Sequence, residues 1–144
     1  MEDHLGCVIT GTVGVDAHVI GTKVISRALR DAGFEVVELG AQTPAEEFIM
    51  AAQETAADAM MISSLYGMAE LDLEGFREKC IEAGLEGILL YLGGILGVAR
   101  HDFAEDEAKF KRMGFDRVYP PEADIRAAIE DLKEDLGRKR AERR

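Results

Sequence analysis

Five short runs of apolar and β-branched residues recur along the chain, and segments with helical periodicity separate them. Short, nearly continuous apolar runs are typical of strands covered on both faces, and such strands alternate with helices in parallel sheets. With no linker between the elements, the pattern predicts an α/β fold: a doubly wound, flavodoxin-like (Rossmann-like) five-stranded parallel sheet with strand order 2-1-3-4-5. The predicted strands are residues 5–12, 34–39, 57–63, 87–92 and 115–119.

The helical segments carry their own start and stop signals. Residues 43–46, Thr-Pro-Ala-Glu, have the form of a capping box with proline at the first helical position. A single helix is expected to contain residues 71–81, and the clearest apolar face belongs to a last helix over residues 125–136. Four glycines are expected just past helix ends, namely Gly33, Gly84, Gly114 and Gly137.

Charge excludes some classes of function. The 144 residues include 28 acidic and 17 basic side chains, a formal charge of -11. A field of this sign repels phosphate backbones and anionic lipid, so we expect no nucleic acid and no membrane as partner of the folded part. We expect a single domain over residues 1–137 and a basic C-terminal tail over residues 138–144. The tail is interpreted as a solvated helix end, with an arm that binds an acidic partner as the alternative.

Location follows from three further features. The longest apolar stretch, residues 87–99, is short and interrupted by glycine, so no membrane-spanning helix is expected. The first residues lack the cationic region and cleavage site of a secretory signal, which predicts a cytoplasmic protein. Cys7 and Cys80 have no Cys or His at ligand spacing, and two reduced core thiols are expected.

The segment after the first predicted strand carries a histidine in a specific context. In a sheet of this order, the ligand crevice lies outside the carboxyl ends of strands 1 and 3. Gly11 and Gly14 lack the lysine and further glycine of phosphate-binding loops. Asp16, His18 and Gly21 form an Asp-x-His-x-x-Gly pattern, in which a carboxylate can orient an imidazole that binds a metal. The spacing alone leaves open both a metal ligand and an ordinary solvated histidine.

Two more loops are predicted at the same edge of the sheet. Strand 3 ends in Ser63, Ser64 and Leu65, and strand 4 ends in Gly93 and Gly94. Hydroxyls and bare backbone beside the histidine would form a slot for a long, partly apolar ligand. Each loop by itself also fits ordinary turn residues.

Taken together, the three loops resemble the cobalamin-binding domain of enzymes that hold their corrinoid through a protein histidine. The signature of that family is D-x-H-x-x-G, then S-x-L, then G-G. Within it, the chain is most similar to the small (S, sigma) subunits of glutamate mutase, also called methylaspartate mutase. The most specific stretches are residues 63–67, 75–85 and 110–121, and the likeness runs from about residue 7 to residue 136.

The resemblance implies that the chain binds adenosylcobalamin and that the cofactor's own base is displaced from the cobalt. His18 would be the lower axial cobalt ligand and Asp16 its hydrogen-bonding partner. No catalytic residue is expected in this chain beyond the cofactor, whose Co–C bond breaks homolytically in such mutases. The implied cofactor-binding residues are Val15, Asp16, Ala17, His18, Val19, Gly21, Ser63, Ser64, Leu65, Gly93, Gly94, Ile95, Leu96, Gly97, Val98 and Ala99.

The resemblance also implies a reaction and a partner. The reaction is the interconversion of L-glutamate and threo-3-methylaspartate by a radical 1,2 shift. The substrate site would belong to a large (E, epsilon) subunit with a barrel fold, in a heterotetramer of two small and two large chains. This chain would be active only with that subunit. Tyr66, Met68 and residues 100–102 are candidates for the contact, with loop surface that binds no partner as the alternative.

Three alternatives remain at this point. Ile95 and Met68 depart from the residues usual in the glutamate mutase subunits, and the first predicted helix is equally similar to that of an acyl-CoA mutase. The chain could therefore be the cobalamin subunit of a related acyl-CoA mutase. A corrinoid methyl-carrier protein and a cofactor-free receiver domain would share the fold. A receiver needs an aspartate at the end of strand 3, where this chain has Ser63.

Overall fold

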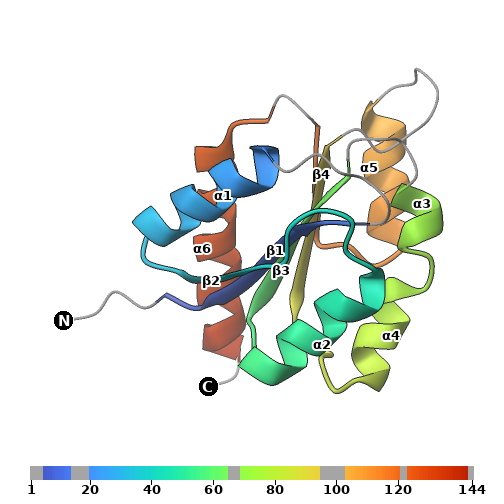
Figure 1. Ribbon diagram of the computed structural model, residues 1–144, viewed down its shortest axis with the longest axis horizontal. Coiled ribbons are helices and arrows are strands. Elements are labelled where there is room, and N and C mark those ends of the chain that lie inside the picture. Colours follow the sequence, from blue (N-terminus) through green and yellow to red (C-terminus); the bar gives the residue numbers. More distant parts are fainter. Residues whose placement is uncertain (1–4, 14–19, 65–68, 95–102, 121–122, 143–144) are drawn as a thin grey trace.

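One parallel sheet organises the protein. The computed structural model describes residues 5–13, 20–64, 69–94, 103–120 and 123–142 (Figure 1). The strands hydrogen-bond in the order β2-β1-β3-β4-β5, and every pairing is parallel, which confirms the predicted fold. The strands are β1 (Cys7–Thr12), β2 (Glu35–Glu38), β3 (Ala59–Ser64), β4 (Leu89–Gly94) and β5 (Arg117–Tyr119).

Helices cover both faces of the sheet. In Figure 1, α1 and α6 lie on one side of the strands, and α2, α3, α4 and α5 lie on the other. This division follows from right-handed crossovers between parallel strands, which change side where the strand order reverses. The helices are α1 (Ile20–Asp31), α2 (Ala45–Thr55), α3 (Ala69–Asp72), α4 (Phe76–Glu82), α5 (Phe103–Arg112) and α6 (Ile125–Glu142).

The core consists of two apolar clusters, one on each face of the sheet. Alternate residues of each central strand go to opposite clusters, as the pleat requires. The cluster under α2–α5 includes Ile9, Met60, Leu90, Phe48 and Phe110. The cluster under α1 and α6 includes Val8, Met61, Tyr91, Leu29 and Leu132. Both faces of the strands are buried, which accounts for the nearly continuous apolar runs in the sequence.

Two of the helix boundaries differ from the sequence prediction. The helix expected over residues 71–81 is two helices, α3 and α4, because Gly75 adopts a left-handed φ of 71° between them. Gly33, Gly84 and Gly114 have positive φ after helix ends, as predicted. Gly137 does not, because α6 continues past it to Glu142.

The predicted capping box before α2 is wrong. Pro44 stands at the N-cap with extended backbone, and no side chain caps the helix. The Thr43 hydroxyl donates instead to the carbonyl oxygen of Gly40 at 3.2 Å. Thr43 is drawn away from the helix because its backbone extends the sheet, with its N–H donating to the Thr12 carbonyl at 3.0 Å. The position of the helix start, at Ala45, agrees with the proline signal.

Both cysteines are buried, free thiols, as predicted. Burial raises the pKa of Cys80 to about 11 and also raises the pKa of Cys7. Thiols with raised pKa values are neutral and unreactive at neutral pH, so both side chains act as core residues.

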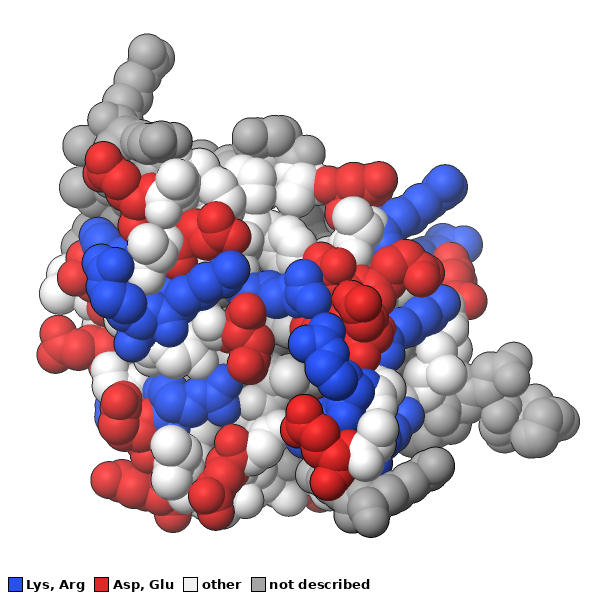
Figure 2. Space-filling view, turned by 180° about the vertical axis from the view of Figure 1, so that it is seen from behind, with Lys and Arg blue, Asp and Glu red and all other residues white. Residues whose placement is uncertain are grey.

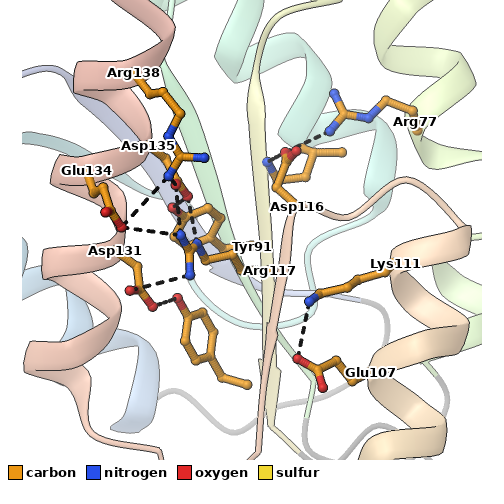
Figure 3. A network of polar contacts seen from close by, with 12 residues as sticks. Arg77, Tyr91, Glu107, Lys111, Asp116, Arg117, Asp131, Glu134, Asp135 and Arg138 are labelled. Carbon is orange, nitrogen blue, oxygen red and sulfur yellow. Dashed lines mark hydrogen bonds and ion pairs between the residues drawn. The ribbon is translucent and has the colours of Figure 1, made fainter.

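Arg77 of α4 holds the amino ends of β4 and β5 together. Its guanidinium donates from Nε to the Gly114 carbonyl and from Nη1 to the Ile88 carbonyl, both at 2.9 Å. Nη2 bonds Asp116 at 2.9 Å, and the same carboxylate oxygen accepts the Leu90 N–H at 2.8 Å (Figure 3). Arg77 thereby joins residues 75–85 to residues 110–121, the two long stretches that carry the family resemblance.

The basic residues near the carboxyl end of the chain continue α6 as far as Glu142. Arg140 donates from Nη2 to the Leu5 carbonyl at 2.7 Å, which ties the last helix to the entry of β1. On the face seen in Figure 2, Lys and Arg side chains are interspersed with Asp and Glu among the coloured residues. Among the described helices, none is both long enough and apolar enough to cross a membrane.

Replacing Arg77 by alanine is expected to lower the free energy of unfolding by about 2–3 kcal/mol, because two carbonyls and Asp116 lose a donor in a half-buried site. Urea unfolding followed by circular dichroism measures the change. The matched control is Arg27→Ala, which removes only an exposed pair with Asp31 at 3.8 Å and should cost at most about 0.5 kcal/mol. Equal midpoints for the two variants would contradict the role given to Arg77.

Candidate functional site

Four strands present one residue each in a row across the carboxyl edge of the sheet. The register pairs Thr12 of β1 with Ser63 of β3, Ser63 with Gly93 of β4, and Gly93 with Tyr119 of β5. The strand order reverses between β1 and β3, so this edge is where open α/β sheets bind ligands.

Alternation along the strands places this row on the face covered by α1 and α6. Two residues earlier on the same face, Thr10 bonds Ser26 of α1, while Met61 and Tyr91 belong to the cluster packed on α6. Side chains two residues apart on a strand point to the same side. The row therefore faces the space between the carboxyl edge of the sheet, α1 and α6.

Three of the four residues in the row are partly exposed, although the residues below them on the strands are buried. Met61 and Tyr91 are buried, whereas Ser63, Gly93 and Tyr119 are partly exposed. At Gly93 no side chain fills the space, and a Cβ there would lie 3.6 Å from the Cβ of Tyr119 and 3.7 Å from its carbonyl oxygen, ordinary contact distances. Gly93 thus forms a bare floor between a hydroxyl on one side and an aromatic ring on the other.

The opposite face of the same edge has a buried hydroxyl. Ser64 follows Ser63 on the strand, so its side chain points to the α2–α5 side. Its Oγ is fully buried and has no hydrogen-bond partner among the residues described. A buried hydroxyl without a partner costs about 1–3 kcal/mol, and such a group at a ligand edge is suited to a partner from outside the fold. Beside it, Gly94 has a φ of 112°, which favours glycine.

The structure describes five of the sequence-predicted site residues. Ser63, Ser64, Gly93 and Gly94 lie together at the carboxyl edge, paired in register, and Gly21 lies in the first turn of α1. Val15, Asp16, Ala17, His18, Val19, Leu65, Ile95, Leu96, Gly97, Val98 and Ala99 lie outside the described residues, as do the expected contacts Tyr66, Met68 and residues 100–102.

Sequence reasoning missed two members of the row. Thr12 is fully buried at the end of β1, and Tyr119 ends β5 next to Gly93. The available signal was the sheet register: once strand order 2-1-3-4-5 is predicted, the last residues of β1 and β5 must come level with those of β3 and β4.

Buried hydroxyls and ion pairs attach α1, the helix that begins beside the predicted histidine segment. The Thr10 and Ser26 hydroxyl oxygens lie 2.8 Å apart in the core. Glu38 at the end of β2 receives Lys23 at 3.7 Å and Arg30 at 3.8 Å from the outer side of α1. These contacts fix the helix against β1 and β2, because the buried hydroxyl pair can be satisfied in one position of the helix only.

A polar network fixes α6 against β4 and β5 (Figure 3). Arg117 of β5 makes a bidentate pair with Asp135 of α6, from Nε at 2.8 Å and from Nη2 at 2.9 Å. The Tyr91 hydroxyl donates to the same carboxylate. The Tyr119 hydroxyl donates to Asp131 at 2.7 Å, and Arg117 lies 3.4 Å from Asp131 as well. The hydroxyls of Tyr91 and Tyr119 thus donate to carboxylates that also pair with Arg117.

The network shifts the titration of its members in opposite directions. Hydrogen bonds from Arg117 hold the pKa of Asp135 below its usual range, against the opposing effect of burial. Burial, reinforced by the carboxylates that accept their hydroxyls, raises the pKa values of Tyr91 and Tyr119 far above the usual one. Asp135 therefore stays charged and both tyrosines stay neutral through the physiological range.

A sequence model of one domain family matches most of the chain. The sequence model of the B12 binding domain matches residues 6–132, which include every described strand and the beginning of α6. The chain belongs to this class of cobalamin-binding domains.

Curated relatives narrow the class. The glutamate mutase sigma subunit of Carboxydothermus hydrogenoformans is 54% identical over 129 residues, covering 90% of this chain and 94% of that subunit. The glutamate mutase sigma subunit of Clostridium cochlearium is 50% identical over 129 residues, covering 90% of this chain and 94% of that subunit. That of Escherichia coli O157:H7 is 45% identical over 131 residues, covering 91% and 88%. Within the class, the chain belongs to the family of glutamate mutase sigma subunits.

Solved structures share the fold at lower identity. A cobalamin-binding protein from Desulfitobacterium hafniense matches with a TM-score of 0.72 at 18% identity, covering 90% of this chain and 58% of that one. The methanol:cobalamin methyltransferase complex of Methanosarcina barkeri matches at 0.67 and 24%, covering 91% and 47%. The receiver domain of the response regulator NarL from Mycobacterium tuberculosis matches at 0.64 and 16%, covering 91% and 98%. Corrinoid proteins and a receiver domain thus share this architecture, so the fold alone does not separate their functions.

Replacing Asp135 by asparagine is expected to lower the free energy of unfolding at pH 7 by about 1–3 kcal/mol, because the charge-assisted bonds from Arg117 are lost. The folded-state pKa of Asp135 is depressed, so its contribution is present above the unfolded value of about 3.9 and is lost as pH falls through the folded value. Urea midpoints should therefore differ between wild type and variant at pH 7 and converge toward pH 2. A constant difference across that range would contradict the assignment, and Asp31→Asn at an exposed pair is the control.

Proposed function

We propose that this chain is the cobalamin-binding subunit of an adenosylcobalamin-dependent carbon-skeleton mutase. Together with a large catalytic subunit, it would interconvert L-glutamate and threo-3-methylaspartate, an isomerase reaction. The observation that carries this proposal is identity of 45–54% to glutamate mutase sigma subunits over about nine-tenths of the chain. The acyl-CoA mutase and methyl-carrier alternatives lack a relative of comparable identity among the proteins compared above.

The residues at the carboxyl edge fit the nucleotide tail of a cobalamin. Such a tail is long, carries a flat base and needs space beside backbone more than it needs charge. Gly93 leaves that space open, although the fold itself would accept a Cβ at this position. Ser63 is partly exposed next to it and offers a hydroxyl. On the other face, the Oγ of Ser64 is buried and has no hydrogen-bond partner among the described residues. In this proposal Ser63 lines the tail slot, while Ser64 lies across the edge from it.

His18 would bind the cobalt of the cofactor, and the carboxylate of Asp16 would accept a hydrogen bond from the other ring nitrogen of His18. The two residues follow β1 in sequence and come directly before α1, whose contacts through Ser26 and Glu38 hold the helix next to the open row. A carboxylate bonded to one imidazole nitrogen fixes the tautomer and makes the other nitrogen a better donor to metal.

When bound, adenosylcobalamin supplies the radical chemistry that starts the rearrangement. The contributions of this chain are binding and orientation: a histidine donor for cobalt, a slot that holds the displaced tail, and a rigid sheet edge beneath them. In this proposal the imidazole proton would be on the nitrogen that bonds Asp16, because an anionic carboxylate is a strong acceptor. The substrate-binding groups would belong to the large subunit.

The partner would cover the carboxyl edge of the sheet. That subunit is proposed to have a barrel fold and to form a heterotetramer of two small and two large chains in the cytoplasm. Leu71 on α3, a large apolar side chain that is 65% exposed, is proposed as a further contact near this edge. It stands a few residues after Tyr66 and Met68, the sequence-predicted contacts.

Histidine ligation is testable by electron paramagnetic resonance of the chain with cob(II)alamin, using protein labelled with nitrogen-15 on histidine. Superhyperfine splitting that changes with labelling is expected in the wild type and absent in His18→Ala. In the complex with the large subunit, His18→Ala should abolish mutase activity without changing the circular dichroism spectrum. Asp16→Asn should bind but turn over slowly. Wild-type activity of the His18→Ala complex would refute the ligation proposed here.

Gly93→Ala separates a ligand requirement from a folding requirement. The added methyl makes only ordinary contacts with Tyr119, and the backbone at this position is not left-handed. The free energy of unfolding should therefore change by less than about 1 kcal/mol. Cobalamin affinity, measured by equilibrium dialysis, should fall at least about tenfold because the methyl occupies the floor of the slot. Gly11→Ala is the contrasting variant: its Cβ would lie 2.9 Å from Phe48, so it should lose stability. Full cobalamin affinity in Gly93→Ala would place the tail elsewhere.

A further inference from the structure

We infer that the ring of Tyr119, held by Asp131, is the wall of the tail slot and packs against the flat base of the cobalamin nucleotide. This inference rests on the proposed function and deepens it, because it assigns the recognition of the tail to β5 and α6. Neither residue belongs to the Asp-x-His-x-x-Gly, Ser-x-Leu or Gly-Gly patterns.

The first observation is the register of the strands, which places Tyr119 beside Gly93. Tyr119 is level with Gly93 and Ser63 in the row that faces α1 and α6. The Cβ of Tyr119 stands 3.6 Å from where a Gly93 side chain would begin. The aromatic residue is therefore the nearest side chain on the β5 side of the bare floor, and anything that lies on Gly93 meets it.

The hydroxyl of Tyr119 carries the second step. It donates to Asp131 of α6 at 2.7 Å, so the ring extends from β5 to the helix. Arg117 lies 3.4 Å from the same carboxylate, and the ring of Tyr91 packs below at 6.0 Å between centroids. A ring fixed at its tip, at its base and on its lower side has lost its freedom before a ligand arrives. Asp131 is thus a positioning residue that acts through Tyr119.

The chemistry of the slot carries the third step. Its floor is backbone, one side is the hydroxyl of Ser63, and the other side is a partly exposed aromatic ring. The charged residues described at its border are ion-paired: Arg117 lies 3.4 Å from Asp131 and makes the bidentate pair with Asp135. A neutral, flat aromatic group with one polar edge fits this arrangement, and the displaced base of a cobalamin has that character. Packing of a base on an aromatic side chain contributes about 1–3 kcal/mol in other proteins.

The test compares two ligands that differ only in the tail. Adenosylcobalamin carries the nucleotide and base, whereas adenosylcobinamide keeps the corrin ring and cobalt but lacks both. Equilibrium dialysis of the full chain in the dark gives both dissociation constants. For each protein, the dissociation constant for adenosylcobalamin is divided by that for adenosylcobinamide. This ratio is then compared between each variant and the wild type, because the cost of displacing the base from cobalt cancels in the comparison.

For Tyr119→Ala, the cobalamin affinity is expected to fall about tenfold, while the cobinamide affinity stays within about twofold. Tyr119→Leu keeps apolar bulk without the ring and should lose affinity in the same direction, which guards against misfolding of the alanine variant. Asp131→Ala should give a smaller loss of about threefold, because the ring remains but is no longer fixed.

Tyr91→Phe is the matched control, because it removes a hydroxyl from the same network one row deeper, away from Gly93. It should lower the urea midpoint and leave the ratio unchanged. Equal losses for both ligands in Tyr119→Ala, or no loss for either, would overturn the inference alone. Failure of the wild-type chain to bind either corrinoid, alone and with the large subunit, would overturn the proposed function, and the inference with it.

Discussion

The hydrogen-bonded register of the parallel sheet is the constraint on which the candidate site depends. Backbone pairing brings Thr12, Ser63, Gly93 and Tyr119 level with one another although they come from four separate parts of the chain. The side-chain period of two then divides each loop motif between the two faces, so neighbouring serines serve different spaces. Slipping a strand by one residue would turn its member of the row toward the α2–α5 face and exchange the strand's residues between the two core clusters.

Polar contacts between α6 and the strands fix the side chains that border the site. Asp135 is buried enough that it needs its donors, and it receives Arg117, Arg138 and the hydroxyl of Tyr91. Such a carboxylate adds specificity of position more than net stability, since an apolar contact could replace it but would not orient Arg117. Because α6 is held through directional bonds, its position relative to β5 is defined, and so is that of Tyr119.

Much of this protein is predictable from its sequence, for reasons that differ between elements. The parallel sheet follows from apolar runs that alternate with helical segments, and its strand order follows from the flavodoxin-like fold class. Gly33, Gly84 and Gly114 follow from the steric freedom that a left-handed turn requires. Local patterns fail where a distant contact competes. Thr43 bonds the edge of the sheet and does not cap the helix as expected. Gly137 remains helical inside α6, in which Arg140, past the glycine, bonds the Leu5 carbonyl. The Arg77 and Arg117 networks lie beyond pattern reasoning, since each joins residues far apart in sequence.

The bond between Arg140 and the Leu5 carbonyl places both described ends of the chain at the amino edge of the sheet. Figure 1 shows these ends on the side away from the carboxyl ends of the strands. A tether attached at either end would thus leave the domain opposite the ligand edge. The same unit could be built as a free subunit or fused to a larger chain without obstructing that edge.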